Sequence, residues 1–164
     1  MSDLVLNALT VGDGILALCP MPGRGGGYAD DLELLREWAP SLVITLASQA
    51  ELVAEGAERL GPDLIESGAR WAHLPVVDFG TPDRAFEDLW PGISRAARAA
   101  LSGGGRVVVH CKGGCGRSGM VALRLMIEAG EAPRPALLRL RAARRCAVET
   151  QAQLDWAVTP TPSG

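Results

Sequence analysis

The sequence is poor in aromatic side chains and in histidine. Phe, Trp and Tyr together make up 4% of the 164 residues, and the chain has two histidines. Proteins that bind single-stranded nucleic acid stack bases on aromatic side chains, so this composition argues against such a role. The formal net charge of −3 points the same way, because nucleic-acid-binding domains are commonly basic. We therefore expect no nucleic-acid partner.

Long apolar runs are also missing. No stretch approaches the roughly 20 apolar residues that a membrane-spanning helix needs, so we expect no stable membrane insertion. The first residues, Met1 to Leu4, lack the basic and then apolar pattern of a secretory signal. A cytoplasmic location is therefore the default expectation.

The cysteines do not form a recognisable metal or disulfide pattern. None of the four belongs to a C-x-x-C pair, and neither histidine has zinc-ligand spacing with them. We expect no metal and no cofactor. In a reducing compartment, free thiols are the expected state rather than a disulfide framework. The four are Cys19, Cys111, Cys115 and Cys146.

Length and apolar content predict one folded domain over residues 1–164. Apolar residues make up 48% of the chain, which is enough for a proper core and argues against disorder. The tail, residues 159–164, contains two prolines and is expected to fray.

Strand-like and helix-like patterns alternate along the chain. This alternation predicts an α/β fold with three layers, in which a mainly parallel central sheet of about five strands is flanked by helices. Ligands of such sheets bind beyond the carboxyl ends of the strands. Strands are expected at residues 4–11, 14–19, 42–46, 71–77 and 106–110, and helices at about 30–39, 48–59, 63–67, 83–101, 120–128, 133–145 and from 150 onward.

One glycine-rich loop between a strand and a helix carries most of the chemistry. It reads His110-Cys-Lys-Gly-Gly-Cys-Gly-Arg-Ser-Gly119 after three valines. A loop of this kind at a helix N-terminus directs free backbone N–H groups and the positive end of the helix dipole at one spot, which suits an anion. A cysteine in that field, Cys111, is expected to ionise easily and to act as a nucleophile. Arg117 can bind a phosphate with two parallel N–H bonds.

These residues resemble a known family. His-Cys, five residues, then Arg-Ser is similar to the signature of the cysteine-dependent protein tyrosine phosphatase superfamily, in its dual-specificity branch. Residues 16–23, 78–83 and 147–153 resemble the kinase-associated phosphatase subfamily, so the resemblance runs from about Leu16 to Trp156. It implies a phosphatase fold and a phosphomonoester hydrolase. The substrate it implies is a phosphoprotein carrying phosphotyrosine, phosphoserine or phosphothreonine.

The resemblance also implies a role for each loop residue. The Cys111 thiolate would attack phosphorus and form a phosphocysteine intermediate, and Arg117 would bind phosphate and stabilise the transition state. Ser118 would donate a hydrogen bond to the sulfur. No metal would be needed, because Arg117 and the backbone supply the positive charge. The backbone N–H groups that would hold the phosphoryl oxygens belong to Lys112, Gly113, Gly114, Cys115, Gly116 and Arg117.

The general acid is expected on a second loop. Asp78 occupies the matching position in the resemblance, whereas Asp83 is better explained as a first-turn helix residue. Phe79 stands where the subfamily often has glycine, which should make this loop stiffer. Gln153 would orient the water that hydrolyses the intermediate, or would form a capping box with Thr150, or both.

Several side chains near the loop have two interpretations. Lys112, the only lysine of the chain, contacts substrate or is there by chance. Either Cys115 or Cys19 would trap oxidised Cys111 in a disulfide, or neither does. His110 is expected to brace the loop through hydrogen bonds. The arginines at 139, 141, 144 and 145 form a solvated face with salt bridges, or steer an acidic substrate.

Three other functions compete with a protein phosphatase. The same mechanism could act on a phosphoinositide or a small phosphorylated metabolite, which Lys112 slightly favours. A rhodanese-type sulfurtransferase has a similar cysteine loop, but it is usually one residue shorter. A phosphate-binding module without turnover usually lacks the nucleophile or the arginine, and Cys111 and Arg117 are both present.

Overall fold

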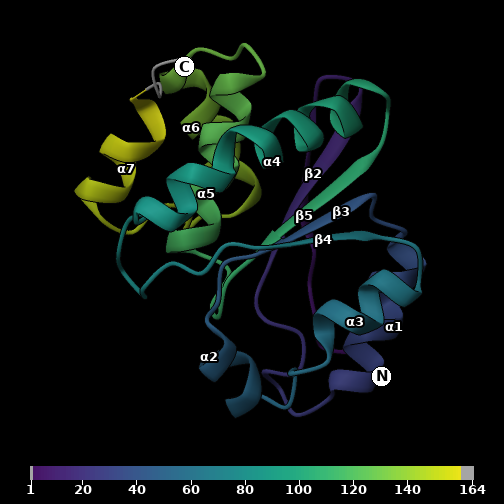
Figure 1. The fold of residues 1–164 in the computed structure, drawn as a ribbon. Helices are drawn as coiled ribbons and strands as arrows, with labels where there is room; N and C mark the ends of the chain where they lie inside the picture. The colour runs from purple at the N-terminus through teal and green to yellow at the C-terminus, as the bar shows by residue number, and fades with distance from the viewer. Residues whose placement is uncertain (1, 160–164) are drawn as a thin grey trace.

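The computed structural model describes residues 2–159, which form a five-stranded sheet between layers of helices (Figure 1). The strand order is β1-β2-β5-β3-β4, with β1 antiparallel to β2 and all other neighbours parallel. The predicted α/β, mainly parallel sheet is confirmed. The strands are β1 (Asn7–Val11), β2 (Gly14–Cys19), β3 (Leu42–Thr45), β4 (Arg70–His73) and β5 (Arg106–His110).

Helices cover both faces of the sheet. Figure 1 shows α4 to α7 gathered on one side, with α1 and α3 on the other. This is the three-layer arrangement expected from the alternating pattern. The helices are α1 (Tyr28–Trp38), α2 (Gln49–Ala54), α3 (Leu60–Glu66), α4 (Arg84–Ser102), α5 (Gly116–Glu128), α6 (Pro133–Ala143) and α7 (Gln151–Val158).

Strand β5 lies in the middle of the sheet and is buried on both faces. Val107 and Val109 point into the core beneath α4 to α7, and Val108 points into the core beneath α1 and α3. Burying each such side chain contributes roughly 1.5–3 kcal/mol. The glycine-rich loop therefore leaves the sheet from its most firmly packed strand, and this fixes the position of the loop.

Several predicted boundaries were wrong by a few residues. The helix predicted at 48–59 ends at Ala54, and Gly56 then takes a positive φ of 70° that stops it. The strand predicted at 71–77 ends at His73, where its partner β3 ends. The helix predicted from Asp83 begins at Arg84. Asp83 is its N-cap rather than a first-turn residue, because the Asp83 carboxylate accepts a bond from Phe86 N–H.

The expectation of four free thiols is also wrong. Cys115 and Cys146 form a disulfide, with Cα atoms 5.1 Å apart, and Cys19 and Cys111 are free. The two partners are 31 residues apart in sequence. They meet only because the chain returns to the loop after α6, which no spacing rule reveals.

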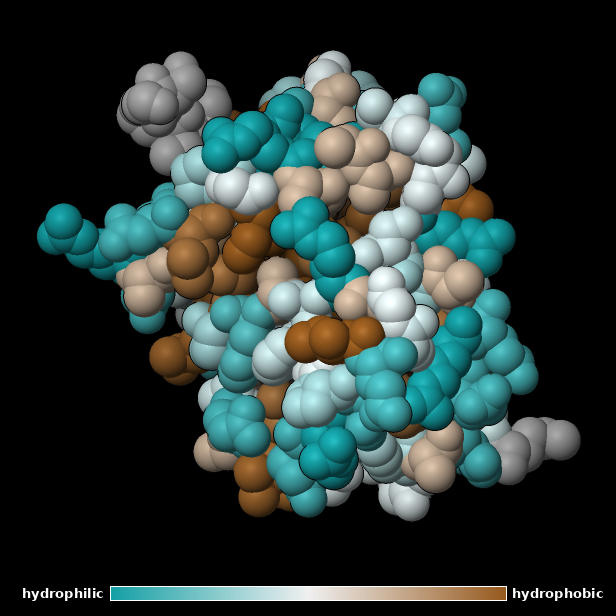
Figure 2. Space-filling model, turned by 45° about the vertical axis from the view of Figure 1, so that its right-hand side comes forward, coloured by the Kyte–Doolittle hydropathy of each residue, from teal (hydrophilic) through white to brown (hydrophobic). Residues whose placement is uncertain are grey.

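The surface shows no single large apolar face in the view of Figure 2, where hydrophobic residues are exposed in small separate groups. Within residues 2–159, no helix is both long and apolar enough to cross a membrane. The tail predicted to fray lies, beyond Thr159, outside the described residues.

Candidate active site

The glycine-rich loop links the end of β5 to the start of α5 and forms the floor of a cavity of about 490 Å³. Cys111 opens the loop and Cys115 is the N-cap residue of α5. The N-terminus of a helix therefore faces this cavity, as predicted. Its lining residues are Arg24, Asp78, Phe79, Cys111, Lys112, Gly113, Cys115, Arg144 and Glu149.

The Cys111 sulfur is almost completely buried and receives two hydrogen bonds. Gly114 N–H donates to Sγ at 3.2 Å, and the Ser118 hydroxyl donates to Sγ at 3.0 Å. Cys111 is 3% exposed. The two donors come from the loop and from the first turn of α5, and together they fix the position of the sulfur.

Position 114 of the loop requires glycine. Its φ is 75°, a conformation that other residues rarely adopt, and a Cβ there would lie 2.7 Å from the backbone carbon of Cys19. The loop can therefore rest directly on the end of β2. Met21 N–H also donates to the Lys112 carbonyl at 3.0 Å, which ties the two segments together.

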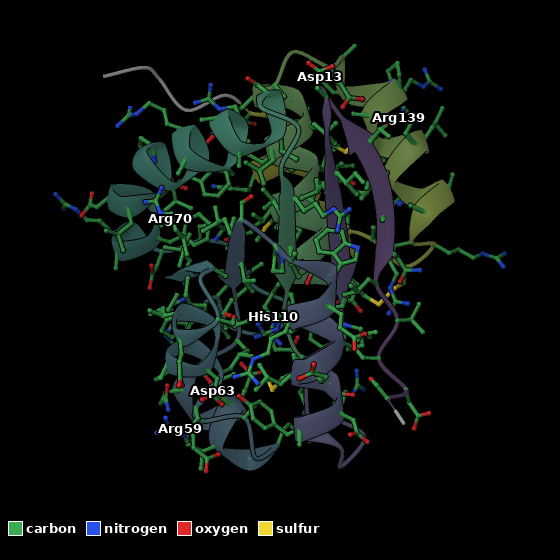
Figure 3. All side chains as sticks on the ribbon, turned by 90° about the vertical axis from the view of Figure 1, so that its right-hand side faces the viewer. Asp13, Arg59, Asp63, Arg70, His110 and Arg139 are labelled. Atoms are coloured by element: carbon green, nitrogen blue, oxygen red, sulfur yellow. A yellow bond between two sulfur atoms is a disulfide. The ribbon has the colours of Figure 1, made fainter. Side chains whose placement is uncertain are left out.

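His110 holds the loop in place through hydrogen bonds, as expected. Trp71 Nε1 donates to the Thr45 hydroxyl, which lies 2.7 Å from His110 Nε2. Nδ1 of His110 lies 3.1 Å from the Cys111 carbonyl, so this nitrogen carries the proton. Burial lowers the pKa of His110 to about 4, which keeps the ring neutral. The His110 side chain is fully buried and is labelled near the middle of the view in Figure 3.

Arg117 is buried with one edge of its guanidinium group occupied. Nη1 and Nη2 donate to the two carboxylate oxygens of Glu51 at 2.8 and 2.9 Å, and Nη1 also donates to the Val76 carbonyl at 3.0 Å. Nε is buried and has no hydrogen-bond partner among residues 2–159. An unsatisfied buried donor costs roughly 1–3 kcal/mol, which an anion bound at Nε would relieve.

Glu51 is a site residue that sequence reasoning missed. In the sequence it stands only in a capping-box pattern with Ser48, and the structure contains that capping box. The hydrogen bond from Arg117 is the largest effect that lowers the pKa of Glu51 to about 2, so the carboxylate stays ionised. Burial disfavours charge on Arg117, yet the bonds to Glu51 and the charges nearby raise its pKa. No spacing rule links residues 51 and 117.

The structure places Asp78, rather than Asp83, at this cavity. One Asp78 oxygen lies 3.5 Å from Arg117 Nη2 and accepts a bond from Phe79 N–H at 3.1 Å. The side chain is 55% exposed and can reach a bound group. Asp83 instead caps α4. Phe79 has a positive φ of 61°, so the unusual phenylalanine stands in a conformation that favours glycine.

Gln153 forms the predicted capping box at the start of α7. Its Oε1 accepts from Thr150 N–H at 3.2 Å, and the Thr150 hydroxyl accepts from Gln153 N–H. Its Nε2 donates to the Gly80 carbonyl at 3.1 Å. The fully buried Gln153 side chain therefore links α7 to the Asp78 loop.

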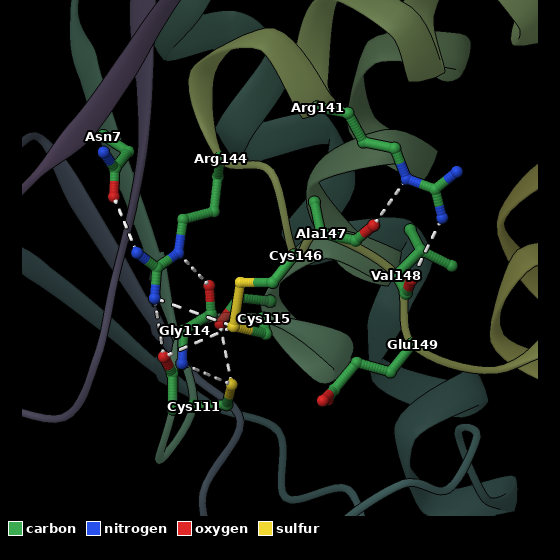
Figure 4. Close-up of a disulfide and its surroundings, with 12 residues drawn as sticks. Asn7, Cys111, Gly114, Cys115, Arg141, Arg144, Cys146, Ala147, Val148 and Glu149 are labelled. Carbon is green, nitrogen blue, oxygen red and sulfur yellow. Dashed lines mark hydrogen bonds between the residues drawn. A yellow bond between two sulfur atoms is a disulfide. The ribbon is translucent and has the colours of Figure 1, made fainter.

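The basic residues near the loop have different partners. Lys112 Nζ lies 3.9 Å from Glu55, so part of its charge is compensated. Arg139 pairs with Glu131, as the salt-bridge interpretation predicts. Arg144 does not belong to a solvated face: its guanidinium donates to the carbonyls of Gly113 and Gly114 inside the loop (Figure 4). No pattern in the sequence indicates this contact.

The buried Cys111 sulfur accepts bonds from the Gly114 N–H and the Ser118 hydroxyl, at the N-terminus of a helix. A cysteine held in this way is the arrangement of a cysteine-dependent phosphatase. Residues 19–131 match the family described as a polymorphic toxin system, DSP-PTPase phosphatase. The chain belongs to this family. It is therefore a dual-specificity phosphatase of the cysteine-dependent protein tyrosine phosphatase superfamily, as its loop motif predicted.

Solved structures with the same fold agree with this family. Tk-PTP in its active form is 30% identical, with a TM-score of 0.66 over 86% of this chain and 87% of that chain. A kinase associated phosphatase whose catalytic cysteine is replaced by serine is 24% identical, with a TM-score of 0.83 over 96% and 93%. PTPMT1 in complex with PI(5)P is 21% identical, with a TM-score of 0.67 over 92% of each chain. A search of curated proteins found no match.

Proposed function

We propose that Cys111 is the nucleophile of this phosphatase. Its sulfur would attack phosphorus, the ester oxygen would leave, and a phosphocysteine would form. The observation that carries this proposal is the sulfur itself, which accepts bonds from Gly114 N–H and Ser118 at the floor of the cavity. The backbone N–H groups of residues 112–117 and the free Nε of Arg117 would bind the phosphoryl oxygens, so that positioning and electrostatics supply most of the catalysis.

Asp78 is the proposed general acid. Its exposed carboxyl would protonate the leaving oxygen, and the resulting carboxylate would then take a proton from the water that hydrolyses the phosphocysteine. Ser118 would donate to the departing sulfur in this second step. Gln153 is the proposed water-positioning residue, which requires its bond to the Gly80 carbonyl to open. In the resting structure it holds the Asp78 loop instead.

The proposed substrate is a phosphorylated protein. The cavity of about 490 Å³ has room for a phosphorylated side chain, and the exposed Phe79 at its rim offers an apolar contact to the neighbouring peptide. The kinase associated phosphatase with a TM-score of 0.83 supports this class.

A phosphoinositide is the second candidate substrate. Lys112 sits beside the cavity and adds positive charge, and PTPMT1 was solved with PI(5)P. The nearby Glu55 offsets part of the Lys112 charge, which weakens this candidate relative to a phosphoprotein. Activity on phosphoinositide vesicles that exceeds activity on phosphopeptides would favour it.

The test is a panel of phosphopeptides, phosphoinositide vesicles and an aryl phosphate, assayed with wild type, Cys111→Ser, Asp78→Asn and Asp83→Asn. Cys111→Ser should abolish hydrolysis while retaining phosphate binding. Asp78→Asn should lower kcat by roughly 10²–10⁴-fold, the usual contribution of a general acid. Asp83→Asn is the matched control, because asparagine still caps a helix, and its kcat should stay close to that of wild type. Chelation with EDTA should not change the rate of hydrolysis. Full activity in Cys111→Ser would refute the mechanism.

A further inference from the structure

Arg144 lines the same cavity as the phosphate loop and contacts that loop through its guanidinium group. Its Nη2 donates to the Gly113 carbonyl at 3.0 Å and its Nε donates to the Gly114 carbonyl at 3.1 Å. Nη1 lies 3.4 Å from Asn7 Oδ1. No carboxylate of residues 2–159 forms an ion pair with Arg144, so its charge acts on the loop carbonyls. Figure 4 shows the Arg144 guanidinium turned toward the loop at Gly114.

These two contacts determine where the loop's N–H groups point. In a planar trans peptide the carbonyl and the N–H of the next residue point in opposite directions. With the Gly113 carbonyl held by Arg144, the Gly114 N–H faces inward, and it donates to Cys111 Sγ. With the Gly114 carbonyl held in the same way, the Cys115 N–H also turns toward the place where phosphate would bind.

The disulfide fastens Arg144 to the loop it orients. Cys146 lies two residues after Arg144, and its partner Cys115 lies directly after Gly114. Ala147 N–H donates to the Arg144 carbonyl at 3.0 Å, and Val148 N–H donates to the Cys115 carbonyl at 3.3 Å. The 144–148 segment is a connection between α6 and α7, without regular structure of its own. The disulfide links this segment directly to the phosphate loop, in addition to the backbone that runs through α5 and α6.

We propose that Arg144 is a positioning residue of the phosphate-binding loop, and that the Cys115–Cys146 bond keeps it in place. The proposal rests on the function proposed above. It adds that the oxidised form, with this disulfide intact and Cys111 free, is the more active one. Reduction by a dithiol breaks the S–S bond with two electrons and two protons. It yields the thiols of Cys115 and Cys146 and the cyclic disulfide of the reductant.

The first experiment compares Arg144→Met and Arg144→Lys with Arg145→Met. Arg145 is the matched control, since it is the neighbouring arginine and is exposed. Arg144→Met should lower kcat/KM for an aryl phosphate by about 10-fold to 100-fold, the usual penalty for misplaced groups. Arg144→Lys keeps the charge but loses the two-pronged geometry, so it should recover only part of the loss. Arg145→Met should match wild type. Equal activity in Arg144→Met and Arg145→Met would overturn the proposal.

Phosphate binding gives a readout that does not depend on turnover. Calorimetry would measure inorganic phosphate binding to Cys111→Ser with and without Arg144→Lys, a variant expected to fold. Adding Arg144→Lys should weaken phosphate binding on the order of tenfold, because the loop's N–H groups are then no longer aligned. Unchanged phosphate affinity would count against Arg144. A wild type that hydrolyses no phosphoester would instead refute the proposed function, so the two failures are distinguishable.

The redox part is tested with Cys146→Ser, because Cys146 lies outside the loop. Wild type with its disulfide intact should exceed wild type reduced with dithiothreitol by several-fold in kcat/KM. Reduced wild type should match reduced Cys146→Ser, and reoxidation with glutathione disulfide should restore only wild type. Mass spectrometry would verify that Cys111 is a thiol in each sample. Activity unchanged or raised by reduction would overturn this part.

Discussion

Glu51 serves two partners with one carboxylate. It completes the capping box of α2 with Ser48, and it holds the outer edge of the Arg117 guanidinium. This second contact uses only Nη1 and Nη2, so Nε of Arg117 has no hydrogen-bond partner among residues 2–159. Glu51 therefore acts as a positioning residue, since fixing one edge of a guanidinium orients the other.

Replacing Glu51 by glutamine separates these two contacts. Glutamine can still form a capping box, so α2 should persist. Arg117 loses its ionised partner, and we expect kcat/KM for an aryl phosphate to fall about tenfold. The pKa of Glu51 falls from its ordinary 4.5 to about 2 in the folded state, so its stabilising effect is complete above pH 4.5 and is lost as the pH drops toward 2. Urea unfolding between pH 5 and 2.5 should show a smaller loss of stability in the variant. An identical pH dependence would contradict this assignment.

His110 gives a second test at the scale of one residue. Burial lowers its pKa from 6.5 to about 4, so folding favours the neutral ring. Its contribution to stability is therefore complete above about pH 6.5 and is lost as the pH falls from there toward 4. The chain has two histidines, which makes NMR titration of the ring signals simple to assign. We expect the His110 signal to titrate near pH 4. A midpoint near 6.5 would mean that the ring is not sealed under the loop.

At the scale of single elements, the pattern of apolar residues predicted which elements exist better than where they end. Three consecutive valines identified β5, because a strand buried on both faces needs apolar residues at every position. The end of β4 depends on where its neighbour β3 ends, and the residues of β4 do not encode that. The same limit applies to the site. Cys111 and Arg117 share one local motif, whereas Glu51 and Arg144 reach it only through the fold.

Helix α5 packs closely on the 147–148 segment through Gly119. A Cβ at Gly119 would lie 2.4 Å from the backbone nitrogen of Val148, so there is no room for a side chain. We expect Gly119→Ala to destabilise the protein by about 1–3 kcal/mol, although alanine favours helices. Gly92 in α4 is the matched control. Its nearest atom would be Arg95 Nη2 at 4.0 Å, so Gly92→Ala should stabilise by about 0.5–1 kcal/mol. Urea unfolding of both variants checks the contrast, and similar effects at the two sites would argue against close packing at Gly119.

At the scale of the whole molecule, the Cys115–Cys146 bond joins the loop on one side of α5 to the chain after α6. It closes a loop of 31 residues that includes α5 and α6. Cross-linking a loop of that size restricts the unfolded chain, and the chain-entropy relation gives roughly 3–4 kcal/mol of stabilisation. Reduction should therefore lower the free energy of unfolding by about that amount, measured by urea denaturation with and without dithiothreitol. Cys146→Ser should be as unstable as the reduced protein and should not respond to the reductant.

If reduction lowers kcat/KM at urea concentrations and temperatures where the protein is still fully folded, the loss of activity reflects a change in the phosphate loop rather than global unfolding. A loss that appears only together with unfolding would assign the disulfide to stability alone.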